Sequence, residues 1–143
     1  MSTLYSSLLA AHTVAAVLGL GSIASVAIVA SKARRAGRGL MEVSIWLGPL
    51  LRYSGLGLAA MLVTGVLLDL TVSGAFSRTW WFRGSVLLLL ATGALHGRAR
   101  QAVRKGLGQE SGNEFVLRRV ERMAYGMCVL IAAITVLMEV KPF

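Results

Sequence analysis

Four long apolar stretches, separated by short polar connections, make up most of the sequence. They cover about residues 4–30, 46–70, 80–97 and 123–140. A helix needs roughly 20 residues to cross the hydrocarbon core of a bilayer, at a rise of about 1.5 Å per residue. Membrane β-strands would be about 10 residues long and would alternate in polarity, which these stretches do not. The pattern therefore predicts an all-α bundle of four transmembrane helices, forming one domain over residues 1–143.

The basic residues lie mostly in two of the three connections. Residues 31–45 contain four of them and residues 98–122 contain seven, whereas the connection between the second and third stretches contains only Arg78. Short loops rich in lysine and arginine stay in the cytoplasm. We therefore expect these two loops to be cytoplasmic and both chain termini to be non-cytoplasmic.

A short helical signal lies inside the second basic connection. Asn113 could cap a helix, or Ser111 and Glu114 could form a capping box. Either arrangement predicts a helix that runs through Arg122 into the fourth span.

Composition and charge fit a membrane protein better than a nucleic-acid-binding one. The chain is 56% hydrophobic and 15% charged, with a net charge of +9. The positive charge is placed as a topology signal, so we expect anionic lipid headgroups and no nucleic acid as its partner. The first charged side chain is Lys32, so the N-terminal stretch lacks the basic start of a secretory signal and is interpreted as a span. A single cysteine, Cys128, excludes an internal disulfide.

Small residues recur four positions apart within the spans. They are Ala11, Ala15 and Gly19; Gly21 and Ser25; Gly55 and Ala59; and Gly93 and Gly97. Such spacing lets the backbones of two helices approach closely. It predicts either a compact bundle or a homodimer face, and the sequence leaves both open.

Ionisable residues inside a membrane span are costly and point to function. Those within the predicted spans are His12, Arg52, Asp69, Arg83, His96 and Glu139. Asp69 and Glu139 could be solvated helix ends or partners of Arg83 and Lys141. Arg52 and His96 lie toward the inner interface, where long side chains snorkel to water. The deepest, His12, could be a ligand or a histidine hydrogen-bonded to a neighbouring helix.

The two histidines are expected at different depths. Helix rise separates His12 and His96 by roughly 15 Å along the bundle axis. The two axial ligands of one haem iron lie much closer together than that. A haem held by one histidine, one haem for each histidine, and no haem all remain open.

Several motifs together resemble one family of membrane proteins. They are an early histidine followed by glycines (His12, Gly19, Gly21), a proline and later glycine in the second span (Pro49, Gly65), an aromatic start, basic residue and late histidine in the third (Trp80, Trp81, Arg83, His96), and the terminal Lys141, Pro142 and Phe143. In their order and spacing these residues resemble the HemJ-type protoporphyrinogen oxidases and the related copper-resistance-D-like and uncharacterised four-span membrane proteins.

This resemblance implies a four-helix protein that binds b-type haem, with the first-span histidine, His12, as axial ligand. In HemJ-type enzymes it also implies oxidation of protoporphyrinogen IX to protoporphyrin IX. The basic residue of the third span is a lysine in that pattern and Arg83 here. Arginine stays protonated and cannot act as a base, but it can pair with a porphyrin propionate. The apolar surroundings of His12 also differ from the HemJ pattern, so the uncharacterised members are the nearer likeness.

Our leading hypothesis is therefore a haem- or porphyrin-binding redox protein in a bacterial inner membrane. His12 would ligate the iron, Arg83 would hold a propionate, and His96 would belong to the same cofactor-binding set. The alternative is a non-catalytic accessory subunit of a larger membrane complex, because the chain has no complete catalytic set and many small-residue helix faces. A small transporter or channel is less favoured, since no span carries a charge near its middle.

Overall fold

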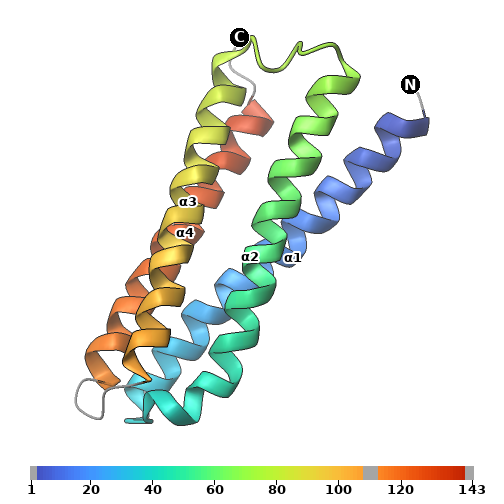
Figure 1. Ribbon diagram of the computed structural model, residues 1–143. Coiled ribbons are helices and arrows are strands. Elements are labelled where there is room, and N and C mark those ends of the chain that lie inside the picture. Colours follow the sequence, from blue (N-terminus) through green and yellow to red (C-terminus); the bar gives the residue numbers. More distant parts are fainter. Residues whose placement is uncertain (1–2, 108–112, 141–143) are drawn as a thin grey trace.

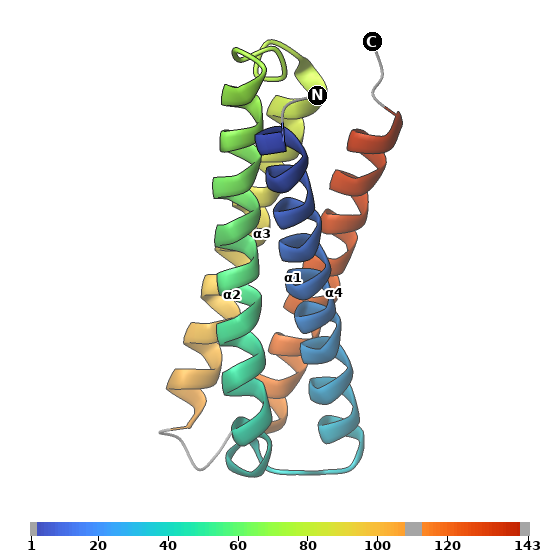
Figure 2. The ribbon, with the colours of Figure 1, turned by 90° about the vertical axis from the view of Figure 1, so that its right-hand side faces the viewer.

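The structure is a computed structural model that describes residues 3–107 and 113–140. In these ranges the chain forms α-helices and no strand, and the prediction of an all-α four-helix bundle is confirmed (Figure 1). The helices are α1 (Thr3–Arg35), α2 (Leu40–Thr71), α3 (Trp80–Gly106) and α4 (Asn113–Val140). They run alternately up and down, so that α1 begins and α4 ends at the same end of the bundle (Figure 2). We call this the termini end, and the opposite end, with most of the basic residues, the basic end.

Three of the four helices are long and apolar enough to cross a membrane. These are α1, α2 and the Glu114–Val140 part of α4, which make the chain a membrane protein. The third helix, α3, is long enough, but its tryptophans, Arg83 and His96 lower its mean hydropathy. Both α2 and α4 run from the basic end to the termini end, so the chain must return between them. Because α3 is that return, we infer that it also crosses the bilayer.

The helices extend past the predicted spans at the basic end. The connection expected over residues 31–45 is reduced to residues 36–39, which turn at Gly37 with φ of +63°. Much of the region 98–122 is also helical, because its arginines, alanines and leucines favour helix once the flanking spans have nucleated it. The predicted helix from Asn113 through Arg122 is confirmed, whereas Ser111 lies outside the described residues.

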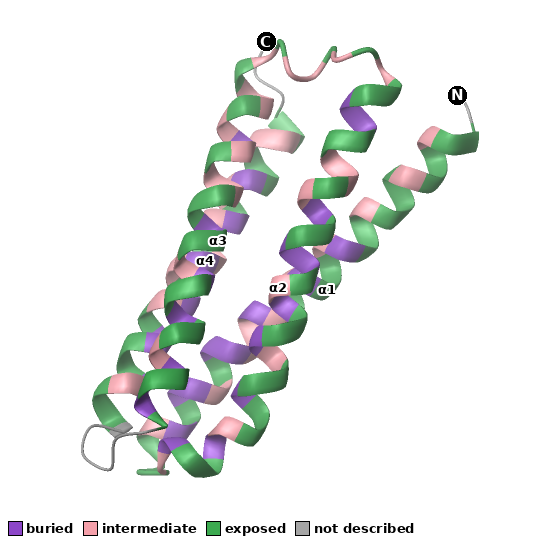
Figure 3. Ribbon diagram, viewed as in Figure 1, coloured by how far each residue is buried: buried purple, intermediate pink, exposed green. Residues whose placement is uncertain are grey.

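The hydrophobic core lies in the half of the bundle near the basic end. Its buried side chains include Ile23, Leu40, Leu47, Leu117 and Met127. Figure 3 colours the ribbon by how far each residue is buried. In the same half, the Nε of Arg34 on α1 donates to Glu121 on α4 at 2.7 Å. Toward the termini end α1 and α4 separate in both views (Figures 1 and 2). The helices are therefore held together by core packing and an ion pair near the basic end, and they pack more loosely at the termini end.

Two glycines allow α1 and α2 to cross in direct backbone contact. A Cβ atom on Gly57 would lie 2.6 Å from the Cα of Gly19, closer than any side chain could sit. Gly19 belongs to a predicted small-residue series, and its partner Gly57 was not among those residues. By contrast, a Cβ on Gly21 or Gly93 would meet nothing within 4 Å. Small residues therefore mark a close crossing at only some of the predicted positions.

Candidate functional site

His12 lies on α1, and one nitrogen of its ring faces α2. The Nδ1 atom lies 2.7 Å from the hydroxyl of Thr64, and the ring packs against Gly65. The Thr64 hydroxyl has one proton, which it donates to the carbonyl of Ala60 at 2.7 Å. When that proton goes to Ala60, the Thr64 hydroxyl accepts its other hydrogen bond from His12 Nδ1–H, and we assign this tautomer to His12. In the neutral ring, Nε2 is then left with its lone pair.

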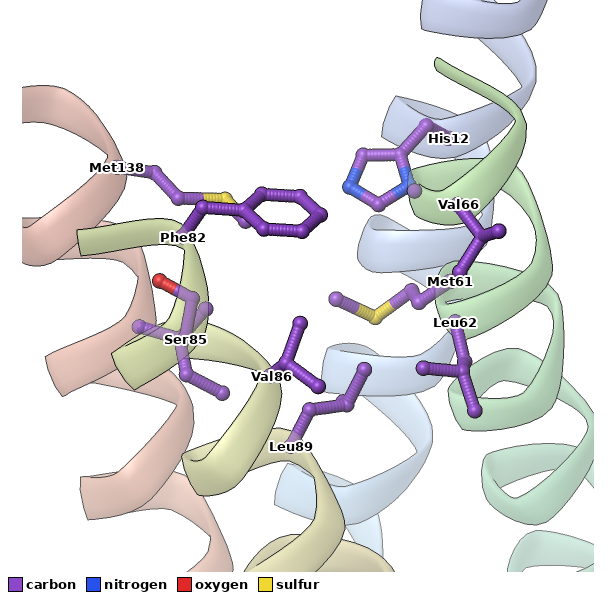
Figure 4. Close-up of a pocket in the computed structure, with 11 residues that line it drawn as sticks. His12, Met61, Leu62, Val66, Phe82, Ser85, Val86, Leu89 and Met138 are labelled. Carbon is purple, nitrogen blue, oxygen red and sulfur yellow. The ribbon is translucent and has the colours of Figure 1, made fainter. Parts of the chain in front are cut away.

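The Nε2 atom of His12 faces a cavity that lies between helices α1 and α2 on one side and helices α3 and α4 on the other. In Figure 4 the ring nitrogen on the side away from α2 points toward Phe82 and Met138. The cavity measures about 30 Å³ and is almost entirely apolar. It is lined by His12, Met61, Leu62, Gly65, Val66, Phe82, Ser85, Val86, Leu89, Ile134 and Met138. His12 thus directs Nε2 into an apolar cavity, while its Nδ1 is hydrogen-bonded to Thr64.

His96 on α3 is placed differently. It is only 8% exposed, and its Nε2 lies 2.7 Å from the carbonyl of Leu51 and 3.0 Å from the Ser54 hydroxyl. A carbonyl can only accept, so Nε2 carries the proton and donates it. The ring fits closely over Gly55, where a Cβ would lie 2.9 Å from its Cε1. The expectation that His96 snorkels to the interface is therefore wrong, because its ring is turned inward and bonded to α2.

Both histidines pack against α2, His12 from α1 and His96 from α3. His12 packs on Gly65 and His96 on Gly55, ten positions apart on α2, which is about 15 Å of helix. This separation agrees with the predicted difference in depth. A groove of about 350 Å³ beside His96 shares Leu62 and Leu89 with the His12 cavity. The structure therefore brings both histidines against the same helix, α2, but does not bring them to one another.

Asp69 and Arg83 organise the connection between α2 and α3 and do not pair with each other. Asp69 is only 8% exposed, and its carboxylate accepts hydrogen bonds from the backbone N–H groups of Phe76 and Ser77 at 2.9 and 3.1 Å. The Nε of Arg83 donates to the Ser77 carbonyl at 2.8 Å. The sequence predicts that Asp69 is a solvated helix end or a partner of Arg83, and both predictions are wrong. It caps a folded turn in which Ser73 adopts a φ of +58°.

Arg83 lies beside the His12 cavity rather than in it. Its neighbour Phe82 lines the cavity, whereas the exposed guanidinium of Arg83 is directed at the turn. Arg52 and Glu139, the remaining ionisable residues of the spans, are exposed on α2 and α4. Of the six ionisable residues in the predicted spans, His12 is therefore the one that lines this cavity.

Sequence reasoning missed Thr64, which gives His12 its orientation, and it named Gly65 only as part of the family resemblance. Thr64 and Gly65 carry the signal, because a threonine next to a glycine in an apolar helix can receive a histidine from a neighbouring helix. Without the pairing of α1 and α2, nothing in the sequence assigns that partner. In the described residues there is no cluster of three or more histidine, cysteine or carboxylate side chains that could hold a metal ion.

Fold and site together define a helical membrane protein in which one histidine, His12, faces an apolar cavity between the four helices. Comparison with models of known protein families, with curated proteins and with solved structures finds no match to this chain.

Proposed function

We propose that this protein binds b-type haem, or a related porphyrin, in the termini half of the bundle and has a redox role there. The supporting observation is His12, whose Nδ1 lies 2.7 Å from the Thr64 hydroxyl and whose Nε2 faces the cavity. Histidines that ligate metals almost always donate their other ring N–H to a fixed acceptor, which sets the tautomer. The pair of His12 and Thr64 has this arrangement.

The donor chemistry of the site fits haem, but its volume in this structure does not. A cavity of about 30 Å³ holds roughly one water molecule, whereas pockets for small ligands measure about 300–1,000 Å³. A macrocycle would enter only if α2 moved away from α3 and α4 and if Met61 and Phe82 changed position. Both side chains are at the loosely packed end, and methionine adapts readily to irregular space.

The other predicted residues take subsidiary roles in this proposal. Arg83 would pair with a propionate through its terminal nitrogens, since only its Nε has a hydrogen bond in the described part of the chain. His96 would support α2 beneath the pocket, because its Nε2 proton is committed to Leu51. When bound, haem would supply one-electron redox chemistry. The likeness to HemJ-type proteins and a bacterial inner membrane with the termini end outside belong to the same proposal.

The proposal is tested by the absorption spectrum of the full chain, expressed with an adequate haem supply and purified in mild detergent. We expect a Soret band that shifts on addition of a reductant, because reduction of the iron changes its electronic state. The binding is checked by titrating haem into the protein purified without it. A protein that shows neither a Soret band nor saturable haem uptake would overturn the proposal.

A second candidate is a non-catalytic accessory subunit of a larger membrane complex. It is favoured by an open groove of about 690 Å³ on the face formed by α1 and α2. Small residues, including Ala15 and Gly57, form part of its lining, and Leu18 and Leu56 are strongly exposed beside them. A transmembrane helix of a partner could lie there, since small residues let helices approach closely.

Native-gel migration in mild detergent separates this candidate from the first. An accessory subunit is expected to migrate in a complex with other proteins from its own membrane when it is extracted gently and at native abundance. A band at the size of a monomer or homodimer, together with a Soret band, would reject the accessory role. A defined complex without haem would support it.

A further inference from the structure

A stripe of arginines on α4 borders a groove at the basic end. Phe115, Arg118, Arg119, Arg122 and Met123 line this groove, which measures about 340 Å³. The other four residues follow Phe115 by three, four, seven and eight positions, which places all five on one face of the helix. All three arginines are exposed, and Met123 is half-buried. The lining of the groove is almost entirely apolar, so the arginines contribute their hydrocarbon stems to it, and their positive charge lies at its border.

Within the described residues, no ion pair neutralises these arginines. At the same end of the bundle, Arg34 is paired with Glu121, and Arg38 is paired with Glu42. No ion pair to Arg118, Arg119 or Arg122 is present within residues 3–107 and 113–140. Glu121 lies next to Arg122 in the sequence, but its carboxylate is turned toward α1. In the part of the chain that the structure describes, the three arginines that border the groove therefore have no ion-pair partner.

The position of the groove along α4 indicates what kind of anion it receives. Arg122 is the last charged residue before a long uncharged run that ends at Glu139. Directly beyond the groove, Gly126 and Leu130 continue the same face of the helix at half-buried positions, and Val129 beside them is 68% exposed. An anion in this groove would thus lie where the headgroup layer meets the hydrocarbon, and its apolar tail would have a path along α4.

We propose that this groove binds an anionic glycerophospholipid. Arg118, Arg119 and Arg122 hold the phosphodiester, and an acyl chain lies along Met123, Gly126 and Leu130. The planar guanidinium forks suit phosphate oxygens better than a point charge does. This proposal concerns the basic end and does not depend on haem binding at the termini end.

The experiment uses the full-length protein in neutral detergent and measures its binding of phosphatidylglycerol by native mass spectrometry. Phosphatidylcholine with the same acyl chains is the neutral comparison, and inorganic phosphate is added as a competitor. Each arginine near a membrane surface contributes to the binding of anionic lipid, so each single change to glutamine should weaken phosphatidylglycerol binding about fivefold. The triple variant should weaken it about a hundredfold and leave phosphatidylcholine binding unchanged.

A matched variant separates a built site from general attraction to positive charge. Changing the exposed Arg98, Arg100 and Arg104 of α3 to glutamine removes the same charge outside the groove. The proposal expects that variant to keep at least most of its preference for phosphatidylglycerol. Equal loss in both triple variants would overturn it, and so would full displacement of the lipid by inorganic phosphate. If the α4 triple variant does not fold, the three single variants decide the question, because each alters one exposed side chain.

Discussion

Substitution His12→Ala is expected to abolish the Soret band of the haem-loaded protein, the largest functional effect that the structure predicts. It removes the one nitrogen that presents a lone pair to the apolar cavity. Thr64→Val should have a graded effect. Loss of an outer hydrogen bond to a ligating histidine typically lowers affinity about 10–100-fold, because the tautomer and ring orientation are no longer fixed. Both effects are measured by titrating haem into the purified protein and following its absorbance.

The matched control is His96→Gln. Glutamine carries an N–H that can reach the Leu51 carbonyl, so the hydrogen bond from α3 to α2 has a replacement donor. We expect this variant to bind haem with unchanged stoichiometry, while circular dichroism verifies that all variants keep their helices. An unchanged Soret band in His12→Ala would contradict the assignment. A halved band in His96→Gln would show instead that each histidine holds its own haem.

The fold was predictable because lipid imposes a simple requirement on sequence. A spanning segment must satisfy its own backbone hydrogen bonds and remain apolar for about 20 residues, and both features can be read along the chain. The limits of the helices were less accessible, because residues such as Lys32 and Arg104 can lie in a helix that continues into the headgroup layer. Charged residues mark where a segment leaves the hydrocarbon core. They do not mark where its helix ends, and both α1 and α3 continue past their first basic residues at the basic end.

The site was predictable only in part, because its geometry depends on which helices pair. Helix rise alone gave the separate depths of His12 and His96. The direction of each ring did not follow from it, since that is set by Thr64 and Leu51 on α2. Asp69 shows the same limit. A carboxylate at a helix end is usually solvated, and only the folded turn after α2 reveals the two N–H groups that it accepts.

The crossing of α1 and α2 provides the largest expected effect on stability. In Gly57→Ala the new methyl group would lie 2.6 Å from the Gly19 Cα and 2.9 Å from its nitrogen. Backbone atoms cannot rotate away as a flexible side chain can, so the two helices must separate. Overpacking of this kind costs about 1–3 kcal/mol, and we expect a loss at the upper end of that range. The measurement is reversible unfolding in mixed micelles, followed by circular dichroism.

Two neighbouring glycines make this prediction specific. Gly19→Ala places its methyl group 3.4 Å from the Gly57 carbonyl carbon, so it should destabilise less than Gly57→Ala although it lies at the same crossing. Gly21→Ala meets nothing within 4 Å and should be neutral or stabilise the helix by about 0.5–1 kcal/mol, because alanine loses less backbone entropy than glycine. The order of stability is the decisive result. If Gly57→Ala were as stable as Gly21→Ala, α1 and α2 would not be in backbone contact at this point, and the orientation of His12 toward Thr64 would lose its structural basis.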